Sequence, residues 1–352
     1  MSIKIPKTIS AAVLYKTCSK LEVVNDLLLP ELKKGQVLVK MFYSGLCHSQ
    51  LMEINGERNQ DHLIPHLLGH EGSGKVIKIG KGVKKVKEND RVVLSWIKSK
   101  GLETGGMKFQ RKSGDLINAG PITTFSNYTI VSENRVVLMP KKITNKISVL
   151  YGCAIPTGSG TILNEIKLKK NSKVGIIGLG GVGMSALLMA SVFKPKILLA
   201  IDIEENKLKL AKKFGATEII NPKQNNVENR VSKITNHNGL DFVIDAAGTT
   251  KTIELGFQII KKFGGELIFA SHPSNGKLIS INPHDLICGK KINGTWGGNC
   301  NMDIDIQKIE KIFRKNKISL NSFVKKVYSL NDINKAVDDL KNRKVLRAII
   351  KF

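Results

Sequence analysis

The sequence predicts an α/β fold in two parts: a β-rich domain followed by a doubly wound parallel sheet. Residues 1–153 contain short runs of β-branched and aromatic residues between turn residues, such as QVLVKMFY (36–43) and DRVVLSW (90–96). After residue 172, six short apolar runs alternate with helix-like segments. We therefore expect a mainly antiparallel β domain at 1–153, a parallel-sheet domain at 154–296, and a C-terminal segment, 297–352, that returns to the first domain.

The composition argues against several classes of protein. The net charge is +27, but the lysines are scattered and form neither a tail nor an arginine-rich block. This pattern favours a solvated surface over a nucleic-acid site. The five cysteines are odd in number and widely spaced, which is not typical of a disulfide framework. No signal peptide is evident, so we expect a cytoplasmic protein.

One uncharged segment, residues 174–193, is long enough to span a membrane. Its glycines have another explanation, so we expect no membrane partner. An apolar strand runs directly into Gly178-Leu179-Gly180-Gly181-Val182-Gly183, and a helix-like segment follows. Gly178 permits a tight turn, Gly180 lets the backbone approach a pyrophosphate, and Gly183 lets the helix pack against the strand. The free N–H groups of the helix N-terminus would then bind the phosphates.

A carboxylate follows at the position that a dinucleotide site needs. The next apolar run ends in Asp202, nineteen residues after Gly183. That side chain can accept hydrogen bonds from the ribose of adenosine and would repel a 2′-phosphate. No arginine follows it, because Ile203 and Glu204 come next. The sequence therefore predicts NAD rather than NADP as the cofactor.

Three residues of the first domain are candidate metal ligands: Cys47, His70 and Cys153. Two thiolates and one imidazole leave one tetrahedral position open, as a catalytic zinc site requires. The spacing alone is only suggestive, because single cysteines and histidines are more often packing residues.

A resemblance extends over nearly the whole chain. The segment Gly69-His70-Glu71-x-x-Gly74-x5-Gly80-x-x-Val83 resembles the signature of zinc-containing alcohol dehydrogenases of the medium-chain dehydrogenase/reductase family. Further segments are similar to that family: GLCHSQL (45–51), GCAIPTG (152–158), residues 200–216, LICGKKINGTWGG (286–298) and VLRAIIKF (345–352). The resemblance implies a GroES-like catalytic domain and a Rossmann cofactor domain.

The resemblance also implies roles for single residues. Cys47, His70 and Cys153 would bind the catalytic zinc, with Glu71 behind the metal or as a transient ligand. Ser49 would hydrogen-bond the substrate oxygen and begin proton release. The remaining roles belong to the cofactor and the substrate pocket: His48 and Arg347 at the pyrophosphate, Asp202 and Lys207 at the adenosine ribose, Thr157 near the nicotinamide, and Trp96 as a bulky pocket wall.

Three departures from the family pattern change these expectations. The loop at 98–117, where the family often holds a structural zinc with four cysteines, contains none, so we expect one zinc ion per subunit. Gln50 replaces the usual aspartate; it could accept a hydrogen bond from the zinc-bound imidazole, but without charge. Met52 replaces the histidine that relays protons in many members, so we expect it to be a packing residue, and the base stays open.

The expected function is zinc-dependent hydride transfer between an alcohol or aldehyde and NAD, in a homo-oligomer of two or four subunits. The strand at 290–296 could pair with its twin in a dimer, by family analogy. Two alternatives stay open: a zinc-free quinone or enone reductase of the same superfamily, and a basic nucleic-acid-binding protein on a dehydrogenase fold. Among the other residues, His62 and His66 are expected to be exposed, and Cys288 and Cys300 to pack.

Overall fold

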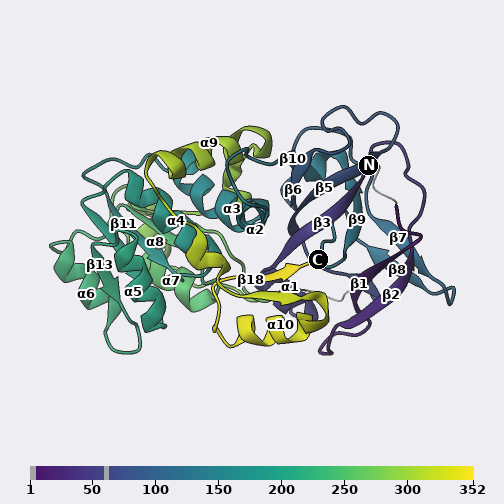
Figure 1. The fold of residues 1–352 in the computed structure, drawn as a ribbon. Helices are drawn as coiled ribbons and strands as arrows, with labels where there is room; N and C mark the ends of the chain where they lie inside the picture. Colours follow the sequence, from purple (N-terminus) through teal and green to yellow (C-terminus); the bar gives the residue numbers. More distant parts are fainter. Residues whose placement is uncertain (1–4, 59–62) are drawn as a thin grey trace. The chain divides into compact units, whose positions relative to one another are not determined.

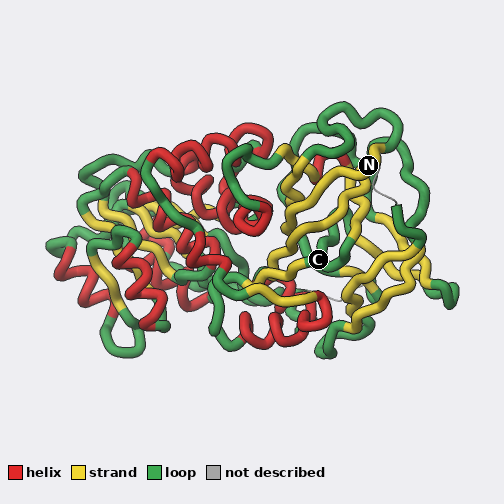
Figure 2. The backbone as a smooth tube through the Cα atoms, in the orientation of Figure 1, coloured by secondary structure: helices red, strands yellow, loops and turns green. Residues whose placement is uncertain are grey.

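The computed structural model describes residues 5–58 and 63–352, which group into two compact units (Figure 1). Unit 1 comprises Met1–Cys153, Asn301–Glu310 and Ser319–Phe352, and unit 2 comprises Ala154–Cys300 and Lys311–Ile318. Strands predominate in unit 1, whereas helices and strands alternate in unit 2 (Figure 2). The predicted fold class, a GroES-like domain with a doubly wound parallel-sheet domain, is confirmed.

Unit 1 contains a small closed barrel. Its strands, in spatial order, are β1 (Thr8–Leu14), β2 (Glu22–Leu28), β7 (Met107–Arg111), β8 (Leu116–Ala119) and β4 (His66–Leu67). Alternate residues of these strands point inward and form one apolar core with residues of β3 and β9. His66 is 6% exposed in β4, so its predicted exposure was wrong. Its strand pairs with both β1 and β8, which surround the side chain. His62 lies outside the described residues.

The second sheet of unit 1 positions the candidate metal ligands. Its spatial order is β10 (Val136–Leu138), β6 (Arg91–Ser95), β5 (Glu71–Ile79), β3 (Gln36–Leu46), β18 (Ala348–Lys351) and β17 (Val327–Ser329), and β9 (Tyr128–Ser132) also pairs with β3. The four neighbours β6, β5, β3 and β18 are antiparallel. The carboxyl ends of β3 and β6 therefore meet the amino ends of β5 and β18 at one edge of the sheet.

Short helices complete unit 1. The α-helices are α1 (His48–Ile54), α2 (Asn145–Ser148) and α10 (Ile333–Lys341), and the 3-10 turns are η1 (Glu133–Arg135), η2 (Val149–Gly152), η5 (Asn321–Val324) and η6 (Leu330–Asp332). Helix α9 (Met302–Lys315) begins among the residues of unit 1 and ends among those of unit 2. Apolar residues of α1 and α10 share a core with β18, so the end of the chain anchors the first helix.

Unit 2 is built on six parallel strands. Their spatial order is β13 (Glu218–Ile220), β12 (Ile197–Ile201), β11 (Lys173–Ile177), β14 (Phe242–Asp245), β15 (Glu266–Phe269) and β16 (Lys291–Gly294). The order reverses direction between β11 and β14, as in a Rossmann fold, and such folds bind ligands beyond the carboxyl ends of the strands at that point.

The connections of unit 2 are mainly helical: α4 (Gly181–Val192), α5 (Glu205–Lys213), α6 (Val227–Ile234), α7 (Thr250–Ile259) and α8 (Pro283–Ile287). The unit also contains α3 (Ala154–Gly160), the π-helix η3 (Thr161–Glu165) and the 3-10 turn η4 (Gly297–Asn299). Apolar residues of α6 and α7 pack with β11, β12, β14 and β15 in one core. This core makes the sheet a stable base for the glycine-rich turn.

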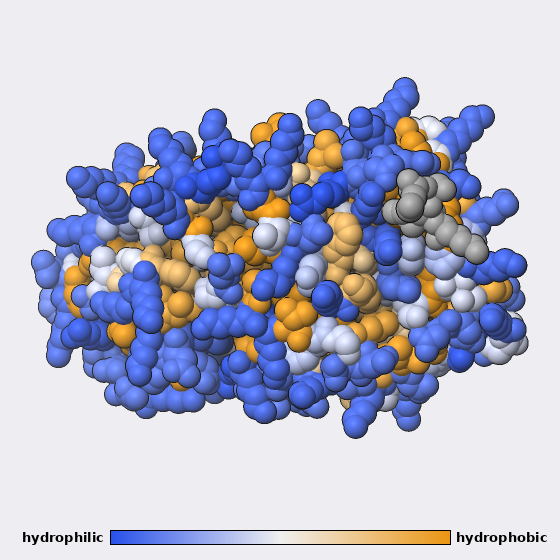
Figure 3. Space-filling view, viewed as in Figure 1, coloured by the Kyte–Doolittle hydropathy of each residue, from blue (hydrophilic) through white to orange (hydrophobic). Residues whose placement is uncertain are grey.

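The uncharged segment 174–193 is explained by β11 and α4 and the turn between them. Most residues of α4 are buried, so the lack of charge reflects burial inside unit 2. Among the described residues, no helix is both long enough and apolar enough to cross a membrane. Hydrophilic side chains cover most of the face in Figure 3, which fits lysines scattered along the chain.

The last strand of the parallel sheet differs from the prediction of six apolar strands. None of the residues of β16 is buried, and Ile287 and Trp296, which flank the strand, are 81% and 78% exposed. Among the described residues, β16 pairs only with β15 and forms an edge of the sheet. Buried parallel strands are apolar on both faces, so this strand lacks the cover that its neighbours have.

Candidate active site

Four candidate site residues lie at the ends of adjacent strands in unit 1. Cys47 follows β3 and Trp96 follows β6, whereas His70 precedes β5 and Arg347 precedes β18. Because these strands are antiparallel neighbours, all four positions lie at the same edge of the sheet. Residues distant in the sequence thereby become neighbours.

Turn η2 brings Cys153 to the same edge. The Ser95 hydroxyl at the end of β6 donates a hydrogen bond to the Gly152 carbonyl at 2.7 Å. A Cβ at Gly152 would overlap the carbonyl oxygen of Leu94, so only glycine permits this close approach. The next residue, Cys153, is buried.

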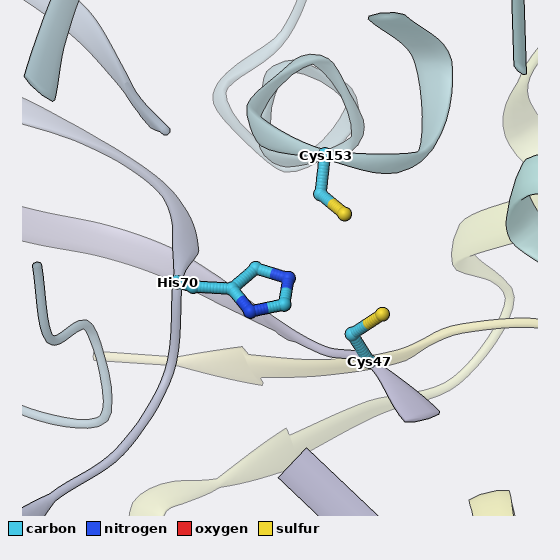
Figure 4. Close-up of side chains that lie close together, drawn as sticks. All are labelled: Cys47, His70 and Cys153. Atoms are coloured by element: carbon cyan, nitrogen blue, oxygen red, sulfur yellow. The ribbon is translucent and has the colours of Figure 1, made fainter. Parts of the chain in front are cut away.

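The two sulfurs and the histidine converge in Figure 4, where the three side chains point toward a shared space. The ligand atoms of Cys47, His70 and Cys153 all lie within 4.8 Å of one another, and no other such group of three or more occurs among the described residues. The buried Nε2 atom of His70 has no hydrogen-bond partner within the described part of the chain. This donor set fits tetrahedral zinc with one position left for substrate.

A buried ion pair lies beside these three residues. The Arg347 Nε atom is 3.4 Å from Glu71 Oε1, and the two side chains are 3% and 0% exposed. A Cβ at Gly45 would overlap that carboxylate oxygen, so glycine on β3 makes room for Glu71. Burial alone would lower the pKa of Arg347, but Glu71 and the sulfurs of Cys47 and Cys153 raise it, so the guanidinium stays charged.

Charge at the cluster also favours a thiolate. The neighbouring Cys153 thiol lowers the pKa of Cys47, and Arg347 and His70 lower it further, against the opposing effect of burial. The pKa of Cys153 is raised by Cys47 and by burial, so the first proton leaves Cys47. Arg347 was expected at the cofactor pyrophosphate. Here it contacts Glu71 and the Leu46 carbonyl, and its role toward the cofactor stays a prediction.

The other nitrogen of the His70 ring faces helix α1. Gln50 is 1% exposed; its Oε1 accepts the Cys47 N–H at 3.1 Å, and its Nε2 lies 2.7 Å from His70 Nδ1. Ser49 Oγ lies 3.3 Å from the same nitrogen. In this geometry the amide nitrogen of Gln50, rather than its oxygen, faces the imidazole. That the oxygen accepts a hydrogen bond from a zinc-bound ring stays a prediction.

The remaining predicted residues of unit 1 surround this cluster. The ring of Trp96 is half-buried and meets the His70 ring edge-on, with 6.3 Å between centroids. His48 is exposed at the start of α1, and Met52 is half-buried in the same helix. The roles predicted for Trp96 and His48 stay predictions.

In unit 2 the glycine-rich turn has the geometry of a phosphate cradle. Gly178 has φ +83°, which side chains rarely adopt, and a Cβ at Gly183 would overlap the Gly178 carbonyl oxygen. A Cβ at Gly180, the N-cap of α4, would meet nothing within 4 Å. The space beside Gly180 is therefore open, which fits the predicted close approach of a pyrophosphate.

Asp202 is 7% exposed at the carboxyl end of β12 and does more than was predicted. Its Oδ2 accepts the Leu179 N–H at 2.6 Å, and its Oδ1 accepts the Glu204 N–H at 2.9 Å. Lys207 Nζ lies 3.7 Å from Oδ2. The carboxylate thus holds the glycine-rich turn in place, and its role toward the ribose stays a prediction. Thr157 is 4% exposed in α3.

Comparisons with known proteins agree with this geometry. The family model described as "Alcohol dehydrogenase GroES-like domain" matches residues 33–141, and the one described as "Zinc-binding dehydrogenase" matches residues 181–313. S-(hydroxymethyl)glutathione dehydrogenase of Escherichia coli O1:K1 is 27% identical over 369 aligned residues, covering 97% of this chain and 99% of that protein.

Solved structures are similar over the full length. Benzyl alcohol dehydrogenase from Acinetobacter calcoaceticus has a TM-score of 0.88 and 29% identity, covering 99% of this chain and 100% of its own. An alcohol dehydrogenase zinc-binding domain protein from Burkholderia ambifaria has a TM-score of 0.90 at 24% identity, covering 98% and 99%, which supports the fold.

The chain belongs to the zinc-containing alcohol dehydrogenases of the medium-chain dehydrogenase/reductase family. It is therefore an oxidoreductase of the alcohol dehydrogenase class. The family resemblance was visible in the sequence, but the glycines that make the site possible were missed. Gly45 and Gly152 each lie one or two residues before a candidate ligand, and that proximity was the available signal.

The loop without cysteines is held by carboxylates in this family member. Glu133 accepts the backbone N–H groups of Lys84, Lys85 and Leu102. Glu103 accepts hydrogen bonds from Ser132 and from the Gly105 N–H. Although burial acts to raise it, these bonds lower the pKa of Glu103 to about 2. The loop thereby has a polar scaffold of its own.

Elsewhere, Cys288 and Cys300 are half-buried, and neither is in a disulfide. The Cys300 thiol donates to the Pro156 carbonyl at 3.2 Å and packs against Gly160. Both contacts fit the prediction that Cys300 packs, and the packing of Cys288 stays a prediction.

Arg347→Met should destabilise the protein by about 3–5 kcal/mol, because it leaves the Glu71 carboxylate buried without its cation. Urea unfolding measures the change. Lys351→Met, which removes an exposed cation from β18, the strand that follows Arg347, should change stability by no more than about 0.5 kcal/mol. In the Arg347→Met variant, a second substitution, Glu71→Gln, should recover part of the lost stability. If Arg347→Met and Lys351→Met have the same free energy of unfolding, the ion pair does not contribute to stability.

Proposed function

We propose that this protein is an NAD-dependent alcohol dehydrogenase with one zinc ion per subunit, held by Cys47, His70 and Cys153. The observation that carries the proposal is the convergence of three ligand atoms within 4.8 Å, around a histidine nitrogen that is buried and has no hydrogen-bond partner among the described residues. A zinc-free reductase, the alternative, gives no reason for this convergence.

When bound, the zinc ion acts as a Lewis acid toward the alcohol oxygen, and NAD accepts the hydride. The protein supplies orientation and proton transfer. Ser49 lies beside His70, where its hydroxyl would hydrogen-bond the substrate oxygen and pass its proton toward solvent. Glu71 and Arg347 stand behind the ligands as a compensated charge pair. Trp96 would limit the room for the substrate.

The cofactor residues follow from unit 2. The N–H groups at the start of α4, in the segment Gly178, Gly180, Gly181, Val182 and Gly183, would bind the pyrophosphate, together with His48 and Arg347. Asp202 and Lys207 would bind the adenosine ribose, and Thr157 would lie near the nicotinamide. The placement of Asp202 at the end of β12 supports NAD over NADP.

The substrate is a small alcohol or the corresponding aldehyde. The named relatives are dehydrogenases of S-(hydroxymethyl)glutathione and of benzyl alcohol, so both substrates belong in a first panel. Zinc binding requires reduced thiolates, and none of the five cysteines is in a disulfide, which supports a reducing compartment such as the cytoplasm.

We further propose a homodimer that forms through β16. This strand is an edge of the parallel sheet, and an edge presents unpaired N–H and C=O groups. Ile287 before the strand and Trp296 after it are large, apolar and almost fully exposed. A second copy paired along the same edge would cover both residues in a symmetric interface.

Replacing a zinc ligand should abolish turnover. Cys47→Ser or His70→Ala should remove the bound zinc and reduce alcohol oxidation at least about a thousandfold, while NAD still binds. Zinc content, initial rates and an NAD titration measure the three effects. Cys288→Ser, a thiol of unit 2, is the control and should retain activity. Full activity in either ligand variant would reject the zinc site.

Asp202→Asn should relax the cofactor preference, because it removes the charge that repels a 2′-phosphate but keeps an oxygen for the Leu179 N–H. The ratio of kcat/KM for NAD to that for NADP should fall at least about tenfold. Glu228→Gln removes an exposed carboxylate of α6 and should leave the ratio unchanged. An unchanged ratio in Asp202→Asn would show that another residue selects the cofactor.

Ile287→Glu should dissociate the proposed dimer, since it places a charge in the covered surface. Size-exclusion chromatography with light scattering should then give the mass of one chain. Leu116→Glu changes an exposed apolar residue of unit 1 and should leave the dimer intact. If both variants keep the mass of the unchanged protein, β16 is not the interface.

A further inference from the structure

The amide of Gln50 is held in one orientation by the backbone of helix α1. Its Oε1 accepts the N–H of Cys47, the N-cap residue of that helix, at 3.1 Å, and the side chain is 1% exposed. The two ends of an amide are not equivalent, because the oxygen only accepts hydrogen bonds and the nitrogen only donates. Turning the amide over would place its NH2 group against the Cys47 N–H, so that two donors would face each other.

This orientation presents a donor to His70. Gln50 Nε2 lies 2.7 Å from His70 Nδ1, a normal hydrogen-bond distance. A hydrogen bond there needs the lone pair of Nδ1, so the proton of a neutral ring lies on Nε2, the nitrogen near the two sulfurs. Ser49 Oγ, at 3.3 Å, is a hydroxyl that can donate or accept, so the amide decides which nitrogen carries the proton.

A metal ion requires the opposite arrangement. A neutral histidine that binds through Nε2 carries its proton on Nδ1 and donates it to an acceptor, which fixes the ring and raises its affinity for the metal. In the observed orientation the Gln50 group that faces Nδ1 is the NH2, which has no lone pair to accept that proton, so the amide has to move before its oxygen can serve as the acceptor.

We propose that Gln50 is a positioning residue that holds the His70 ring in the wrong tautomer for zinc and so weakens the affinity of this site for the metal. The inference rests on the proposed function, because it concerns the same zinc ion. Its consequence is a site that loads and releases zinc more readily than one in which a carboxylate faces the imidazole.

Gln50→Glu is the sharpest test, because it exchanges one atom. The oxygen that accepts the Cys47 N–H remains, and the nitrogen facing His70 becomes an acceptor. The zinc dissociation constant, measured by competition with a chromophoric chelator, should fall about 10- to 100-fold. Zinc uptake is read directly, without reference to enzyme activity.

The chain offers a matched control. Gln36 is 4% exposed at the other end of β3, and its Oε1 accepts the N–H of Lys33, also three residues earlier in the chain. Gln36→Glu therefore makes the same chemical change away from the metal ligands and should leave zinc affinity unchanged. Circular dichroism of both variants verifies that the fold is retained.

A second measurement separates hydrogen-bond polarity from added charge. The 15N shifts of the His70 ring, in metal-free protein at mildly alkaline pH, report which nitrogen is protonated. The proton should lie on Nε2 in the unchanged protein and on Nδ1 in Gln50→Glu. If Gln50→Glu binds zinc more tightly but the proton stays on Nε2, the added charge alone explains the tighter binding and the proposal is overturned. An unchanged zinc dissociation constant would also overturn it.

Failure of the proposed function gives a different result. If neither protein binds zinc, the zinc assignment fails and the proposed effect on zinc affinity fails with it, whereas the 15N shifts still decide whether Gln50 sets the tautomer of His70. The expected exchange of tautomer would support it, and the same tautomer in both proteins would overturn it.

Discussion

The antiparallel register of β6, β5, β3 and β18 is the constraint on which the metal site depends. It places Cys47, His70 and Arg347 beyond strand ends that meet at one edge of the sheet. Successive residues of a strand point to opposite faces, so a slip of one position would turn Glu71 away from Arg347. The last strand, β18, pairs with β3 in this register, and the Ser95 hydroxyl holds turn η2 and with it Cys153 at the same edge.

Charge at this edge is balanced by a few buried groups. Two cysteines and Glu71 would be costly as anions in a buried place, because burial penalises unpaired charge. Arg347 offsets part of that cost, and a divalent ion between the sulfurs would offset the rest. The same balance explains why a single polar contact, the Gln50 amide on His70, has consequences for the metal: the ligands have few other partners to compensate for a misplaced proton.

The two units use different physical means to bind their ligands. Unit 2 forms its proposed cofactor site largely from backbone, with an open glycine at the start of α4 and one carboxylate that also fastens the turn. Unit 1 forms its site from side chains of four segments. A backbone site depends on a short stretch of sequence with a particular conformation, whereas a side-chain site depends on how strands pair.

The sequence by itself determined the fold class, the glycine-rich turn and Asp202, because each is a local pattern in which strand, turn and helix follow one another in a single stretch. It also identified Cys47, His70 and Cys153, but only through resemblance, since their spacing says nothing of convergence. Tertiary structure alone decided that Arg347 pairs with Glu71, that His66 is buried between two strands of the barrel, and that Gln50 presents a donor. These outcomes depend on which side chains become neighbours when the strands pair and on which of their atoms are hydrogen-bonded to the backbone. Neither can be read from the sequence, because both involve residues that are brought together only by folding.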